Sequence, residues 1–217
     1  MMKSLLLVFV DLDGTLVDPK INNTYDFILF LYLYKIRSPR LVKLMLFLIT
    51  KYLYILAIVL SKLQVKVDTY TVLISIVFCC FSSKTLRTVS LYWIHLLFRE
   101  RLIRTDIIKQ VTRIKTSFPG KVEVFVLTCC VEYPACLLAE KFGFKCLSRE
   151  LRKKGDLVFS LKDAHLCHIT KAEKYVNIIK LFIKLYSQKP FTVYILDDAS
   201  ANNEKPLLTL FNKVIIV

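Results

Sequence analysis

A run of six apolar residues followed at once by two acids constrains the fold of this chain more than any other feature. Leu5–Val10 contains no polar residue and is typical of a buried β-strand. Asp11 and Asp13 come next, and Gly14 and Thr15 indicate that the chain turns there. In an open α/β sheet, ligands bind at the carboxyl ends of the strands. Two carboxylates in that position are costly without a cation or a proton, so the sequence predicts a binding site.

The length and the cysteine content limit the class of protein. A chain of 217 residues accommodates one α/β domain with an insertion and is short for two independent domains. The seven cysteines are odd in number and form no C-x-x-C pair, and no signal peptide precedes the first strand, so we expect a reducing, cytosolic compartment. His165, Cys167 and His168 lie close together, but no second ligand pair accompanies them. We therefore interpret them as loop and surface residues rather than as zinc ligands.

The positive charge is concentrated in one apolar part of the chain. The net charge is +15, and between Phe27 and Arg99 ten Lys and Arg residues stand against the single acid Asp68, which gives +9. The composition is 55% hydrophobic and the mean hydropathy is +0.52. A basic surface alone would suit nucleic acid. The apolar and aromatic residues between these charges favour an anionic membrane surface instead, so we expect no nucleic-acid partner.

Residues 24–108 are predicted to form an inserted, strongly apolar helical cap. No Gly or Pro interrupts the chain from Arg40 to Lys66. Arg40, Lys51 and Lys62 recur every eleven residues, about three helical turns, and fall on one line of the helix. Such a helix lies in a large core, in a bilayer interface or in a membrane hairpin.

The apolar windows within this cap come close to the length of a membrane span. Leu44–Leu60 holds one charge, Lys51, whereas Tyr70–Phe81 is too short to span alone. Charges break every window of about twenty residues, which favours interfacial or hairpin embedding over a pair of transmembrane helices. A helical insertion that packs as a bundle in water stays open as the alternative.

Strand and helix patterns alternate from Lys121 onward. The predicted strands are Val122–Leu127, Phe144–Leu147, Leu157–Leu161, Thr192–Leu196 and Val214–Val217. The predicted helices are Pro134–Phe142 and Ala172–Tyr186. This alternation indicates an α/β fold with a Rossmann-like, three-layer parallel sheet. We predict a catalytic core of residues 1–23 and 109–217, interrupted by the cap at 24–108.

The first motif resembles that of a known superfamily. Asp11–Thr15 resembles the DxDGT motif of the haloacid dehalogenase (HAD) superfamily of phosphatases and phosphotransferases. The insertion after this motif is similar to that of the phosphoserine-phosphatase-like subfamily. The resemblance implies that Asp11 is a nucleophile that forms an aspartyl phosphate and that Asp13 is the general acid and base. Thr128, at the end of a predicted strand, would then bind a phosphoryl oxygen.

The resemblance also implies a lysine and a metal site. Glu173–Val176 resembles the lysine motif that opens a helix, so Lys174 is the first choice for binding phosphate and Lys171 the second. The acids Asp197 and Asp198 end the strand Thr192–Leu196.

Carboxylate oxygens at that strand end suit a hard cation. The resemblance implies Mg²⁺ bound by Asp11, by the main-chain carbonyl of Asp13 and by an acid of the Asp197–Asp198 pair. The family pattern places a second acid four residues on, but here three extra residues precede Pro206. Either Asp198 or Glu204 could supply that acid.

We therefore expect a Mg²⁺-dependent phosphatase that hydrolyses a phosphomonoester. The cap, which holds few acids apart from Asp26 and Asp68, argues against a free amino-acid phosphate. A lipid or lipid-precursor phosphate at the cytoplasmic face of a membrane suits the apolar, basic cap. The alternatives are a soluble small-metabolite phosphatase of the phosphoserine-phosphatase type and a catalytically silent, membrane-anchored binding module.

Overall fold

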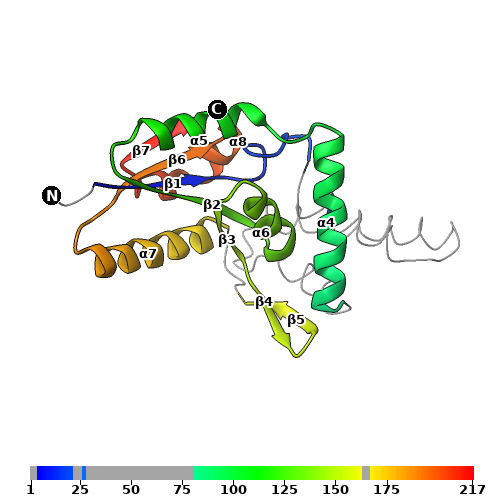
Figure 1. Ribbon diagram of the computed structural model, residues 1–217. Coiled ribbons are helices and arrows are strands. Elements are labelled where there is room, and N and C mark those ends of the chain that lie inside the picture. The colour runs from blue at the N-terminus through cyan, green and yellow to red at the C-terminus, as the bar shows by residue number, and fades with distance from the viewer. Residues whose placement is uncertain (1–3, 22–25, 28–80, 163–166) are drawn as a thin grey trace, which may run out of the picture.

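The computed structural model describes residues 4–21, 26–27, 81–162 and 167–217 (Figure 1). The predicted basic line of Arg40, Lys51 and Lys62 lies outside these residues, as do the apolar window Leu44–Leu60 and nearly all of Tyr70–Phe81. The strands are β1 Leu5–Val10, β2 Lys121–Val131, β3 Lys145–Arg149, β4 Leu151–Lys154, β5 Leu157–Leu161, β6 Phe191–Leu196 and β7 Lys213–Ile216. The helices are α4 Ser83–Arg99, α5 Thr105–Ser117, α6 Glu132–Lys141, α7 Cys167–Tyr186, α8 Asp198–Asn203 and α9 Lys205–Leu208.

The main sheet is parallel and has β1 at its centre. Its strand order is β3-β2-β1-β6-β7, and every neighbouring pair runs parallel. Val10 is in register with Val126 on one side and with Ile195 on the other. The carboxyl ends of β1, β2 and β6 therefore meet at one edge of the sheet. The predicted parallel Rossmann-like sheet is confirmed.

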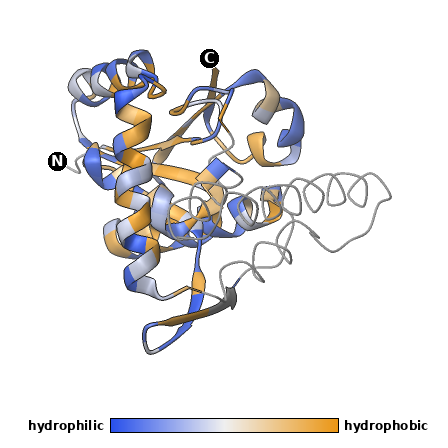
Figure 2. Ribbon diagram, turned by 90° about the vertical axis from the view of Figure 1, so that its right-hand side faces the viewer, coloured by the Kyte–Doolittle hydropathy of each residue, from blue (hydrophilic) through white to orange (hydrophobic). Residues whose placement is uncertain are grey.

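Helices cover both faces of this sheet, which gives the predicted three layers (Figure 1). Alternate side chains of β1 point to opposite faces. Val8 and Val10 belong to the core beneath α4, α5 and α6. Phe9 belongs to the core beneath α7, where it contacts the rings of Tyr175 and Phe211 at 5.3 and 5.4 Å between centroids. Apolar residues accordingly fill the central strands in Figure 2.

Strand β2 continues beyond Leu127, where the strand predicted from the sequence ends. Its pairing with β3 shifts register between Leu127 and Val131, so the intervening residues form an irregular stretch. After β3, the antiparallel pair β4 and β5 forms a small hairpin, so the predicted strand Leu157–Leu161 is present but lies outside the parallel sheet. A single backbone bridge between Ser82 and Leu157 joins this hairpin to the start of α4.

The described end of the predicted insertion consists of helices that pack on the core. The Ser82 hydroxyl caps α4 by accepting a hydrogen bond from the Thr85 amide at 3.1 Å. The next helix, α5, begins at Thr105, ahead of the predicted boundary at residue 108, and buries Ile107 and Val111. Among the residues that the structure describes, no helix has both the length and the apolarity to cross a membrane.

Candidate active site

Asp11 lies where β1 ends, at the centre of the sheet edge. The Asp11 amide donates to the Ile195 carbonyl at 2.9 Å, so the backbone of this residue still belongs to the sheet. Asp11 is 3% exposed, and its Oδ1 accepts a hydrogen bond from the Leu12 amide at 2.8 Å. The carboxylate is therefore buried and fixed in orientation by the adjacent backbone.

The loop after β1 folds onto the end of β6. Gly14 has φ +77°, and a Cβ there would lie 2.6 Å from Oδ2 of Asp197. This close approach explains the glycine, because any side chain would displace the acid. Thr15 Oγ1 accepts a hydrogen bond from the Asp197 amide at 2.8 Å. Asp13 is half-buried in this loop, and its backbone pairs with Val17.

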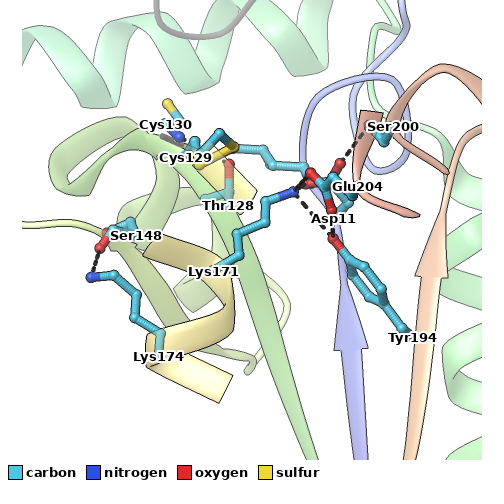
Figure 3. The surroundings of a disulfide bond; sticks show 12 residues. Asp11, Thr128, Cys129, Cys130, Ser148, Lys171, Lys174, Tyr194, Ser200 and Glu204 are labelled. Carbon is cyan, nitrogen blue, oxygen red and sulfur yellow. Dashed lines mark hydrogen bonds and ion pairs between the residues drawn. A yellow bond between two sulfur atoms is a disulfide. The ribbon is translucent and has the colours of Figure 1, made fainter. Parts of the chain in front are cut away.

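Lys171 brings its ammonium to Asp11. Its Nζ lies 2.8 Å from Oδ1 of Asp11, 2.5 Å from Oε1 of Glu204 and 3.1 Å from the Tyr194 hydroxyl. The Tyr194 hydroxyl donates in turn to Oε2 of Glu204 at 2.9 Å. All four residues are at most 5% exposed. Figure 3 shows Lys171 reaching from α7 across the end of β2 to this cluster.

The charges in this cluster act on one another strongly because all four groups are buried. Burial alone would lower the pKa of Lys171, but the negative charges of Asp11 and Glu204 outweigh it and raise that pKa. Burial raises the pKa of Glu204, and the charge of Asp11 acts in the same direction. Burial and the two carboxylates also hold the pKa of Tyr194 well above 10.0. Tyr194 therefore remains a neutral hydrogen-bond donor, and Lys171 remains charged.

Lys174, the first choice from the sequence, lies elsewhere. Its ammonium donates to the main-chain carbonyl of Ser148, and Figure 3 shows it pointing away from Asp11. It lines a cavity of about 410 Å³ together with Glu132 and Glu150. Of the two candidate lysines, the structure therefore brings Lys171 to the acids. The helix begins at Cys167 rather than at Ala172, so the first helical turn precedes Lys171.

Thr128 and the acids after β6 occupy the same edge of the sheet. Thr128 is 1% exposed, and its Oγ1 accepts a hydrogen bond from the Cys130 amide at 3.0 Å. Asp197 caps α8 by accepting from the Ser200 amide at 3.1 Å, whereas Asp198 is exposed in the first turn of that helix. The Ser200 hydroxyl donates to Oδ2 of Asp11 at 2.8 Å.

Ser200 and Tyr194 are the members of this site that the sequence analysis missed. Tyr194 lies inside an apolar strand, where its pattern indicates only core packing. Ser200 lies between Asp197 and the expected second acid and carries no motif of its own. Glu204, kept open as the second acid, contacts Lys171 and Tyr194.

The oxygen atoms around Ser200 match the donors that Mg²⁺ prefers. Asp11 and Asp197 both accept hydrogen bonds from Ser200, so the two carboxylates face one small region. In the described part of the chain, no three His, Cys, Asp or Glu side chains form a metal cluster.

Comparisons with known proteins define the fold. No protein-family model and no curated protein matches the chain. The structure of a protein of unknown function from Bordetella pertussis Tohama I matches with a TM-score of 0.73 and 12% identity. The match covers 98% of this chain and 90% of that protein. A probable phosphoserine phosphatase from Vibrio cholerae matches with a TM-score of 0.61 and 12% identity, over 98% of this chain and 56% of its own.

A third neighbour is a HAD-family hydrolase from Salmonella enterica subsp. enterica serovar Typhi. It matches 97% of this chain and 61% of its own, with a TM-score of 0.59 and 11% identity. The chain thus has the HAD fold of the phosphoserine-phosphatase-like type, as its first motif indicates. At sequence identities this low, structural similarity shows the fold alone. Evidence for an activity comes from the geometry of the site.

Proposed function

We propose that the protein is a Mg²⁺-dependent phosphatase that hydrolyses a phosphomonoester through an aspartyl phosphate. The observation that carries the proposal is the buried pair of Asp11 and Lys171, 2.8 Å apart at the carboxyl edge of the parallel sheet. A carboxylate held at that edge beside a fixed cation suits attack on a phosphoryl group, whose reaction requires positioning and neutralisation of charge.

Each residue of the cluster has a part in this chemistry. A carboxylate oxygen of Asp11 forms a bond to phosphorus while the bond to the leaving oxygen breaks. Asp13 donates a proton to that leaving oxygen and then takes one from the water that hydrolyses the aspartyl phosphate. Thr128 donates its hydroxyl hydrogen to a phosphoryl oxygen. Lys171 neutralises charge on Asp11 and on the incoming phosphoryl oxygens.

Glu204 and Tyr194 hold Lys171 in place for this step. The carboxylate of Glu204 accepts from both Lys171 and Tyr194, so it fixes the ammonium without touching the phosphoryl group. Mg²⁺, bound by Asp11, Asp197 and the main-chain carbonyl of Asp13, would supply further neutralisation of phosphoryl charge. Asp198, exposed on α8, has no role in this ligand set.

The test is the loss of activity in Asp11→Asn. This variant keeps the shape of the side chain but removes the nucleophile and the charge that Mg²⁺ needs. We expect hydrolysis of p-nitrophenyl phosphate in Mg²⁺ to fall by at least about a thousandfold, with an unchanged circular dichroism spectrum. Asp18→Asn, in the same loop, is the matched control and should retain activity. Hydrolysis at the native rate by Asp11→Asn would exclude the aspartyl-phosphate mechanism.

The alternative from a different functional class is a catalytically silent, membrane-anchored binding module. It predicts that the wild-type protein does not hydrolyse any phosphomonoester of a broad panel, with or without Mg²⁺. The proposed phosphatase predicts turnover that EDTA abolishes and that added Mg²⁺ restores. The same panel separates small metabolites from lipid phosphates as substrates.

We further propose a lipid or lipid-precursor phosphate as the substrate, at the cytoplasmic face of a membrane. The support is the composition of the cap segment, where Arg40, Lys51 and Lys62 interrupt long apolar stretches almost without acids. Sedimentation with anionic liposomes at low and high salt tests this. We expect the protein in the pellet, with binding reduced by salt. A monodisperse protein that stays in the supernatant at both salt concentrations favours the soluble small-metabolite phosphatase.

A further inference from the structure

Two disulfides, which the sequence analysis did not predict, lie in the described part of the chain. Cys136 in α6 is bonded to Cys146 in β3, ten residues away. Cys129 in β2 is bonded to Cys167, the first residue of α7, over a separation of 38 residues. Only the Cys129–Cys167 bond joins two elements, β2 and α7, that carry residues of the proposed phosphate site.

The second bond holds the start of the helix that carries Lys171. Residues four apart in an α-helix lie on the same face, one turn above the other. Cys167 and Lys171 have this spacing, so the disulfide and the ammonium lie on one face of α7. The first turn of a helix lacks intrahelical partners for its amides and frays easily. A covalent bond at the first residue therefore limits the movement of the turn that precedes Lys171.

The other end of the bond lies in the least regular part of β2. Cys129 follows Thr128 directly, within the stretch where the pairing with β3 shifts register. The pairing of β2 with β1 ends at Val126. The disulfide therefore supplies a connection at the point where regular strand pairing stops. Figure 3 shows the bond beside Thr128 and near the path of Lys171 toward Asp11.

We propose that the Cys129–Cys167 disulfide is a redox-sensitive site that controls the positions of the two phosphate-binding residues, Thr128 and Lys171. The bond fixes Thr128 relative to Lys171 when it is closed, and opening it loosens both groups. Both cysteines are half-buried, so we expect a small dithiol to reach the bond. In the reducing compartment that the cysteine content predicts, protein disulfides are usually transient and redox-sensing. This inference rests on the proposed function for the role of the two groups.

The chemistry is thiol–disulfide exchange with a dithiol reductant. One thiolate of the reductant attacks a sulfur of the bond and forms a mixed disulfide, which the second thiolate resolves. The reductant ends as its own disulfide. Cys129 and Cys167 end as two thiols, having gained two electrons and two protons.

The experiment compares oxidised and dithiothreitol-reduced protein, each with its linkage verified by mass spectrometry of alkylated peptides. Isothermal titration calorimetry with inorganic phosphate measures binding without turnover. Hydrolysis of p-nitrophenyl phosphate gives KM and kcat. We expect reduction to weaken phosphate binding and to raise KM about tenfold, since small displacements of positioning groups have effects of up to about a hundredfold. The reduced wild-type protein needs no substitution, so a folding defect does not obscure the result.

Two double variants assign the effect to one bond. Cys129→Ser with Cys167→Ser should bind phosphate as the reduced wild type does, whatever the redox state. Cys136→Ser with Cys146→Ser is the matched control and should keep the response to dithiothreitol. Equal phosphate affinity in verified oxidised and reduced protein overturns the inference. A protein that hydrolyses nothing but changes its phosphate affinity on reduction refutes the proposed activity and supports the redox site.

Discussion

Replacement of Lys171 by methionine should show how strongly the buried cluster depends on one cation. Methionine keeps much of the length of the side chain but removes the charge. Asp11 and Glu204, which are 3% and 5% exposed, then lie close together without a counterion. Removing one partner of a buried ion pair costs about 3–5 kcal/mol, because the remaining charge is uncompensated.

The remaining hydrogen bonds place the expected cost at the lower end of that range. Asp11 still accepts from the Leu12 amide and the Ser200 hydroxyl, and Glu204 still accepts from Tyr194. We therefore expect a loss of about 3 kcal/mol in the free energy of unfolding. At about 2–4 °C per kcal/mol for a chain of this size, the melting temperature should fall by about 6–12 °C. The kcat/KM for p-nitrophenyl phosphate should fall at least a hundredfold, by about 3 kcal/mol in transition-state stabilisation.

Lys174→Met is the matched control for this measurement. Lys174 is half-buried and donates to the carbonyl of Ser148, away from Asp11 and Glu204. Its loss should cost about 1 kcal/mol or less and change kcat/KM less than about threefold. Urea unfolding followed by circular dichroism measures both variants. A larger loss for Lys174→Met than for Lys171→Met, in stability and in activity, would refute the assignment.

A double variant separates the charge effect from lost packing. Glu204→Gln removes one of the two carboxylates that Lys171→Met leaves without a counterion. The double variant should recover about 1–2 kcal/mol of the stability lost in Lys171→Met, because contacting residues couple by amounts of this order. It should recover no activity, since the cation beside Asp11 is still absent.

Three further changes test the metal site, the loop and the acid dependence of stability. Asp197→Ala should raise the Mg²⁺ concentration needed for half-maximal activity more than Glu204→Ala does, as metal titrations will show. Gly14→Ala should cost about 1–2 kcal/mol in urea unfolding and weaken Mg²⁺ activation, because φ is +77° and the new Cβ would lie 2.6 Å from Asp197 Oδ2. Burial raises the pKa of Glu123, but hydrogen bonds from two lysines outweigh it and hold that pKa below 4.5. The folded-state pKa is depressed, so Glu123→Gln should cost about 1 kcal/mol at pH 7, a difference that disappears as pH falls through the folded pKa below 4.5.

Local sequence patterns were enough to predict the position of the nucleophile candidate and the class of sheet. Leu5–Val10 is apolar at every position, which is typical of a strand buried on both faces, and both cores contain its side chains. An acid directly after such a strand lies at the carboxyl edge in any parallel α/β sheet. Thr128 and Asp197 follow apolar strand patterns in the same way, so local patterning was sufficient to bring them to that edge.

The groups that surround Asp11 depend on how the helices and strands pack in three dimensions. Lys171 and Lys174 are separated by less than one helical turn, and the local sequence does not show which of them faces the sheet edge. That choice depends on how α7 packs, and the structure directs Lys171 to Asp11 and Lys174 to Ser148. Long-range contacts also bring Tyr194, Ser200 and the Cys129–Cys167 bond to the site. Such contacts join residues far apart in the chain, so no periodicity or spacing in the sequence encodes them.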